Sequence, residues 1–97
     1  MALKAGVREE YERRHNPIWP ELQAVLKEHG VRNYSIFINR NDDTLFAYVE
    51  IASEELWAKI AETAACQKWW LYMKDLMITN LDNSPVSVTL DGVFHLD

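Results

Sequence analysis

The sequence predicts an α+β fold, because segments with helical periodicity and segments with strand periodicity alternate along one short chain. The first third has apolar residues at steps of three and four, the middle holds two β-branched and aromatic runs, and further helical patterns follow. With 97 residues, the chain has room for one hydrophobic core. We therefore expect a single domain that spans residues 1–97.

Residues 7–29 are predicted to be helical, with a bend or a restart near Asn16. Apolar residues recur along this segment at helical spacing, so one stripe is expected to face the core. Pro17 disfavours the helical conformation at the residue before it, and Pro17 itself is expected at a tolerated first-turn position of the restarted helix. Gly30 supplies the left-handed residue that ends the segment.

Residues 34–39 and 44–51 are predicted to form a β-hairpin, because both runs are rich in β-branched and aromatic residues and flank the polar sequence RNDD. Both faces of the second strand are apolar, with Val49 on one face and Phe46 and Tyr48 on the other. Helices that cover one face of the sheet would leave the apolar side chains of the other face exposed to solvent. We therefore expect a second copy of the chain to pack against it, which makes a homodimer.

The second half of the chain is predicted to contain two helical stretches, a loop and a last strand. Ser53 is expected to cap a helix that ends near Ala65, because acidic residues follow it in the first turn. The stretch 66–77 carries a broad apolar arc at helical spacing. Residues 80–85 have the composition of a loop, and residues 93–97 alternate like a strand.

Residues 1–4 add the stub of an edge strand before the first helix. The resulting order of strand, helix, strand, strand, helix and strand is the ferredoxin-like split βαβ pattern. Two such sheets packed face to face would make a dimeric α+β barrel.

The net charge of −5 argues against a nucleic-acid partner or an acidic membrane surface, since both require a cluster of basic residues. The basic pair Arg13 and Arg14 follows several acids, and pairing within the helix, such as Glu9 with Arg13, explains it. Cys66 is the only cysteine, so no disulfide or thiolate metal site is expected. The N-terminal residues lack the apolar run of a signal peptide or a membrane span, which predicts a cytoplasmic protein.

Tyr11 and His15 are expected to point at one spot, because residues four apart lie on the same helical face. A histidine on an apolar stripe is often a satisfied core residue, and strand packing explains Tyr34 equally well. Trp69 and Trp70 point about 100° apart on a helix, so at most one of them stacks flat on a ligand.

Together these residue types suit a carbohydrate, because indole faces contact C–H surfaces while phenols and imidazoles exchange hydrogen bonds with hydroxyls. The chain has no glycine-rich phosphate loop, no metal-ligand spacing and no nucleophile beside a base. A pair of facing carboxylates for glycoside hydrolysis is also missing from the stripe. Proton transfer without a cofactor or metal is the chemistry that survives this elimination.

Four motifs extend the argument: EYERRHNPIWPEL, NYSIF, CQKWWLYMKDLM, and DNSPV followed by VFHLD. In this order and spacing, they resemble the L-rhamnose mutarotase family from Tyr11 onward. The resemblance implies a cytoplasmic homodimer with a dimeric α+β barrel fold that interconverts the α and β anomers of L-rhamnose. It also implies that His15 is the proton donor. The sugar-binding residues that it implies are Tyr11, Tyr34, Trp69 and Trp70.

Two other classes of function remain open on the sequence. The same scaffold is used by non-enzymatic modules that sense a small ligand. It is also used by cofactor-free monooxygenases and haem-degrading proteins, in which His15 would be an axial ligand.

Overall fold

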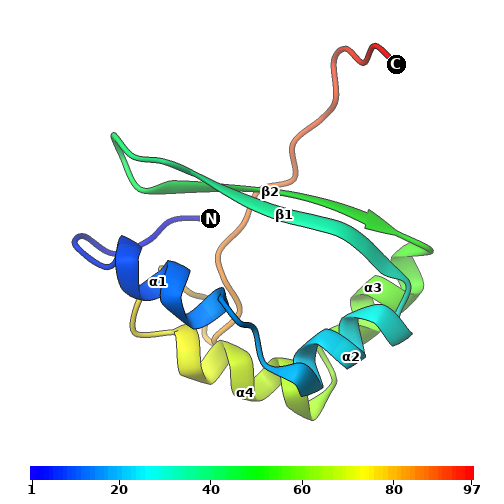
Figure 1. Ribbon diagram of the computed structural model, residues 1–97, viewed down its shortest axis with the longest axis horizontal. Coiled ribbons are helices and arrows are strands. Elements are labelled where there is room, and N and C mark those ends of the chain that lie inside the picture. Colours follow the sequence, from blue (N-terminus) through cyan, green and yellow to red (C-terminus); the bar gives the residue numbers. More distant parts are fainter.

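The computed structural model describes all residues, 1–97, and contains helices on one face of a β-sheet (Figure 1). The fold is α+β, as predicted. Its elements in chain order are α1 (Arg8–His15), α2 (Pro20–Glu28), β1 (Val31–Asn39), β2 (Thr44–Ile51), α3 (Glu54–Ile60) and α4 (Ala64–Met73).

The first helical region is divided into α1 and α2, which confirms the predicted break near Asn16. Asn16 leaves the helical region of backbone space, with φ −131° and ψ 88°, as expected for the residue before a proline. The proline in the first turn of α2 is Pro20 and not Pro17 as predicted, because Pro17 lies in the turn between the two helices. The missing N–H of Pro20 leaves no intrahelical bond unmade at that position. The break allows α1 to take its own direction across the sheet.

Gly30 ends the second helix and is needed there for two reasons. Its φ of +79° lies in the left-handed region, which residues with a Cβ atom rarely adopt. A Cβ at this position would lie 2.5 Å from the Cβ of Ala52, so the turn leaves no space for one. The predicted stop at Gly30 is confirmed.

The hairpin of β1 and β2 is antiparallel, and Phe37 lies directly opposite Phe46. A bulge between Arg32 and Ser35 interrupts the regular pairing near the start of β1. Residues that alternate along the strands face the helices, whereas Phe37, Phe46 and Tyr48 are exposed on the other face. The predicted two-faced apolar sheet is therefore present.

Residues 1–4 lie between β2 and residues 76–79, where they bridge the two. Leu45 N donates to Met1 O at 2.8 Å on one side, and Ile78 N donates to Ala2 O at 3.1 Å on the other. The spatial order is thus β1, β2, residues 1–4 and residues 76–79, which is the order of the split βαβ fold. The stub predicted at the sheet edge is an interior strand.

The last strand predicted at residues 93–97 is wrong for the single chain. Residues 76–79 take the fourth place in the sheet, and the C-terminal residues form an extended tail that leaves the domain beyond the sheet (Figure 1). Alternating apolar residues specify a strand only where a sheet edge is available to pair with them. Within this chain the tail has none, and its apolar side chains, such as Phe94, are exposed.

The third and fourth helices differ from the predicted boundaries, because a second cap divides the region. Ser53 caps α3 as predicted, with its side chain accepting a hydrogen bond from Leu56 N at 3.1 Å. Thr63 then caps α4 by accepting from Cys66 N at 3.3 Å. Helix α3 therefore ends at Ile60, and helix α4 begins at Ala64; both positions come earlier in the chain than predicted.

The buried core is small and lies between the sheet and the helices. Twelve side chains are buried, and they form one cluster. No helix of the structure combines the length and apolar character needed to cross a membrane.

Candidate active site

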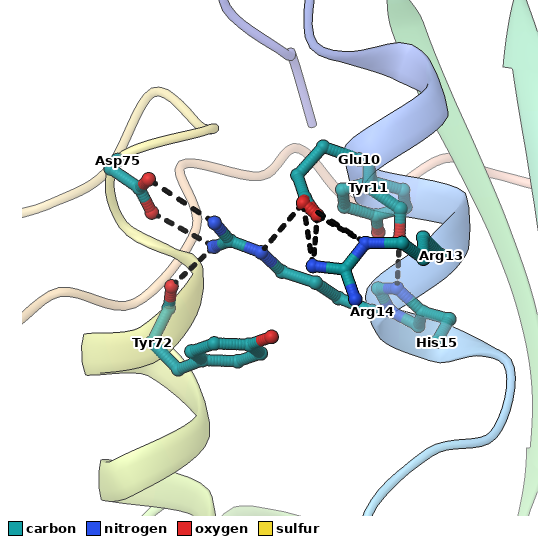
Figure 2. A network of polar contacts seen from close by, with 7 residues as sticks. All are labelled: Glu10, Tyr11, Arg13, Arg14, His15, Tyr72 and Asp75. Atoms are coloured by element: carbon teal, nitrogen blue, oxygen red, sulfur yellow. Dashed lines mark hydrogen bonds and ion pairs between the residues drawn. The ribbon is translucent and has the colours of Figure 1, made fainter.

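The α1 helix places Tyr11 and His15 on its inner face, one turn apart, as predicted. Their ring centroids are 4.4 Å apart, and His15 Nδ1 lies 2.9 Å from the backbone oxygen of Tyr11 (Figure 2). Tyr11 is buried, whereas His15 is half-buried. The one hydrogen bond of the imidazole to the protein is therefore made within its own helix.

This hydrogen bond decides which nitrogen of His15 carries the proton. A carbonyl oxygen only accepts, so Nδ1 must be protonated and donate to it. In the neutral ring, Nε2 then has a lone pair and can accept a proton. Burial lowers the pKa of His15 below its usual 6.5, and the bond to the Tyr11 carbonyl opposes this shift. At neutral pH the ring is consequently an uncharged base.

Trp69 and Trp70 are adjacent on α4 but have different surroundings. Trp69 is buried and meets His15 edge to face, with ring centroids 5.0 Å apart and planes at 88°. Trp70 is half-buried and packs on the edge of the core. Both indoles line the same hollow as His15. Trp69 thus supports the imidazole, and Trp70 has the more accessible face.

Tyr34 comes from β1 and faces the helices across the hollow. Its ring lies 6.1 Å from the ring of Trp57 on α3, and 41% of its surface is open. Burial raises the pKa of Tyr34, and burial followed by the nearby Tyr34 raises the pKa of Tyr11. Both phenols therefore stay uncharged at neutral pH and can donate or accept hydrogen bonds.

An open hollow of about 1490 Å³ lies between the helices and the sheet. All the site residues predicted from the sequence line it, although they come from two helices and a strand. Roughly 300–1,000 Å³ is usual for a small-molecule pocket, so this hollow exceeds the need of one monosaccharide. The walls combine aromatic rings with a few polar groups. The lining residues named as candidates are Tyr11, His15, Tyr34, Trp69 and Trp70.

Three aromatic residues near the site were not predicted to belong to it. Trp19 lies 5.1 Å from Trp69 and 5.1 Å from Tyr72, while the ring of Trp57 lies 6.1 Å from that of Tyr34 with the planes tilted by 59°. Trp19 lies in the break of the first helical region, directly before Pro20. A large aromatic residue at this break was the sequence signal that could have predicted its place near the site. Tyr72 was expected only as part of an apolar arc.

The basic pair on α1 also differs from the prediction. Arg13 pairs with Glu10 three residues away, rather than with Glu9 (Figure 2). The side chain of Arg14 extends from α1 to the end of α4, where its two terminal nitrogens donate to the carboxylate of Asp75 at 3.0 and 3.3 Å. Pairing within one helix therefore explains Arg13 but only part of the contacts of Arg14, which also lies 3.7 Å from Glu10 Oε2 but makes its hydrogen bonds with Tyr72 and Asp75, the latter 61 positions away in the sequence.

Comparison with known proteins agrees with this arrangement. The family model described as L-rhamnose mutarotase matches residues 1–96. The chain belongs to the L-rhamnose mutarotase family. An L-rhamnose mutarotase of Shigella flexneri is 57% identical over 99% of this chain and 92% of its own length. One from Escherichia coli O1:K1 is 56% identical over the same shares.

A solved member of the L-rhamnose mutarotase family has the same fold. The crystal structure of an L-rhamnose mutarotase from Formosa agariphila matches with a TM-score of 0.90 and 41% sequence identity. The match covers all of this chain and 93% of the other. The predicted ferredoxin-like fold class and the family resemblance are both confirmed.

Proposed function

We propose that this protein is an isomerase that interconverts the α and β anomers of L-rhamnose. Family membership supports the substrate and the reaction class. The observation that carries the mechanism is the bond from His15 Nδ1 to Tyr11 O, which leaves Nε2 without a protein partner at the wall of the hollow. A neutral imidazole in that place can take up and return one proton in each turnover.

The reaction requires a proton to leave the anomeric hydroxyl and another to reach the ring oxygen. In our proposal, a bound water takes the O1 proton and passes it to Nε2 of His15. The imidazolium formed in this way protonates the ring oxygen, the C1–O5 bond breaks, and the open-chain aldehyde results. Rotation about C1–C2 and reversal of the same steps close the ring as the other anomer. The proton count balances, and no cofactor or metal takes part.

Three of the remaining four candidates bind the sugar in this proposal. Tyr11 and Tyr34 exchange hydrogen bonds with its hydroxyls, because their raised pKa values keep them uncharged. Trp70 offers its accessible face to the C–H surface of the ring, while buried Trp69 holds the imidazole. General acid–base help is typically worth about 10²–10⁴-fold, which suits a reaction that sugars also undergo unaided.

We further propose that two chains associate through the outer face of the sheet. Phe37 is 61% exposed, its cross-strand neighbour Phe46 is 44% exposed, and Tyr48 is 56% exposed. Contiguous apolar side chains of this kind mark an interaction surface. Two sheets joined by that face would form the dimeric α+β barrel. The cytoplasmic location stays a prediction from the sequence.

Exchange NMR on L-rhamnose at anomeric equilibrium tests the enzymatic proposal. The rate of exchange between the α and β signals of H1 is expected to rise in proportion to the protein concentration. L-Fucose and galactose, measured under the same conditions, report selectivity and are expected to respond less. A rate that is unchanged by the protein at every concentration contradicts the proposal.

A further inference from the structure

Arg14 joins the helix that carries His15 to the end of α4. One terminal nitrogen donates to Tyr72 O at 2.7 Å and to Asp75 Oδ1 at 3.0 Å, and the other donates to Asp75 Oδ2 at 3.3 Å (Figure 2). The backbones of α1 and α4 have few close approaches, so side chains set their spacing. A guanidinium holds two partners in a fixed geometry, because its donors form a planar fork.

The same guanidinium begins a continuous series of ring contacts that ends at His15. Its central carbon lies 4.4 Å from the ring centroid of Tyr72. Tyr72 lies 5.8 Å from Trp69, and Trp69 lies 5.0 Å from His15. Trp19 braces the middle of the series, at 5.1 Å from both Tyr72 and Trp69. A displacement of Tyr72 therefore reaches the imidazole through one intervening ring.

The neighbouring Arg13 takes no part in the fork to Asp75 and Tyr72 O and gives the comparison. Its side chain is 69% exposed and hydrogen-bonds Glu10 on its own helix, whereas the side chain of Arg14 is 13% exposed. Arg14 Nε is buried with no hydrogen-bond partner, 3.7 Å from Glu10 Oε2. Leaving a buried donor unpaired costs free energy, so the contacts of the fork and the ring must offset that cost.

We propose that Arg14 is a positioning residue for the reaction: its fork to Asp75 and Tyr72 sets the spacing of α1 and α4, and the ring series holds His15 in place. The role rests on the function proposed for His15. Proton transfer depends steeply on geometry, and a misplacement of 1 Å can cost about 10²-fold in rate. Arg14 itself need not touch the sugar.

Three variants separate this role from simpler ones. Arg14→Met removes the charge and the fork, Arg14→Lys keeps the charge but loses the fork, and Arg13→Met removes a charge from the same helix while leaving the fork to Asp75 and Tyr72 O in place. For each we would measure kcat and KM by exchange NMR, the pKa of His15 from its imidazole resonances, and the thermal unfolding midpoint. The imidazole titration does not depend on catalysis.

Both changes at Arg14 are expected to lower kcat by about 10-fold or more with a smaller effect on KM, as misplacement of a proton carrier predicts. They are also expected to move the pKa of His15 up toward 6.5, since looser packing against Trp69 admits water. Arg13→Met should match the unaltered protein. A charge effect alone would appear in Arg14→Met but spare Arg14→Lys, and that result would overturn the proposal.

A purely structural role would lower the unfolding midpoint of the Arg14 variants while kcat per folded molecule and the His15 titration stayed unchanged, which also overturns the proposal. If Arg14→Met does not fold, Asp75→Asn tests the same fork from its exposed end and is expected to shift the titration in the same direction. If the unaltered protein accelerates no anomer exchange, the proposed function fails, and the His15 titration still decides whether Arg14 holds the ring.

Discussion

At the scale of single residues, the central feature is the tautomer of His15. The chain contains a natural comparison, because His29 makes the same type of bond, from Nδ1 to the oxygen of Val25 at 2.7 Å. His29 ends α2 and does not line the hollow. The two histidines thus share a local geometry and differ in what their second nitrogen faces.

Replacing His15 with alanine is expected to remove the acceleration of anomer exchange, a loss of about 10²–10⁴-fold, because the variant lacks the proposed proton carrier. The matched change His29→Ala should leave the rate unaltered. Exchange NMR measures both, and circular dichroism checks that both variants are folded. A His15→Ala variant with full activity would discard the proposed role.

The pH dependence follows from the lowered pKa of His15. The free enzyme must present a neutral imidazole, so kcat/KM is expected to hold at neutral pH and fall as the pH drops through a midpoint below 6.5. Between that midpoint and 6.5 the unfolded chain binds more protons than the folded one. This contribution to stability is therefore present above 6.5 and lost on acidification. A midpoint at or above 6.5 would contradict the assignment.

At the scale of elements, α4 places two adjacent tryptophans in different environments. The helical rotation of about 100° per residue places Trp69 in the core against His15 and leaves Trp70 at the rim. Thr63 caps the N-terminus of α4 and therefore determines at which residue the helix that carries both tryptophans begins.

The two tryptophans are therefore expected to respond differently to removal. Trp69→Ala should lower the free energy of unfolding by about 3–5 kcal/mol, as usual for a large aromatic lost from a core. Trp70→Ala should cost much less stability and mainly raise KM, because it removes the proposed sugar contact. Thermal unfolding and exchange NMR at increasing L-rhamnose measure the two effects. Similar losses of stability in both variants would refute the division.

At the scale of the whole molecule, the outer face of the sheet and the tail leave much apolar surface uncovered. A stable interface buries about 800 Å² on each partner, and a sheet face of this kind can supply a large part of that area. A domain of this size also gains stability from a partner, because it buries only a moderate share of its own surface.

Phe37→Ser is expected to shift the protein from dimer to monomer, since Phe37 lies on the outer face opposite Phe46. Leu81→Ser is the control, because Leu81 is fully exposed and lies outside the hairpin that carries Phe37 and Phe46. Size-exclusion chromatography with light scattering measures the mass of each variant. An unaltered protein that is monomeric at high concentration would rule out the proposed dimer.

Local features of this protein were predictable from the sequence because neighbouring residues determine them. The break before Pro17, the stop at Gly30, the hairpin and the cap at Ser53 depend on backbone preferences within a few positions. The shared face of Tyr11 and His15 follows from helical spacing alone.

Contacts between distant segments were decided only by the tertiary structure. Residues 1–4 lie inside the sheet and residues 76–79 complete it, because strand pairing depends on which edge is free and not on an alternating pattern. Arg14 meets Asp75 for the same reason: no local rule links positions 61 apart, and only the packing of α1 beside α4 brings them together.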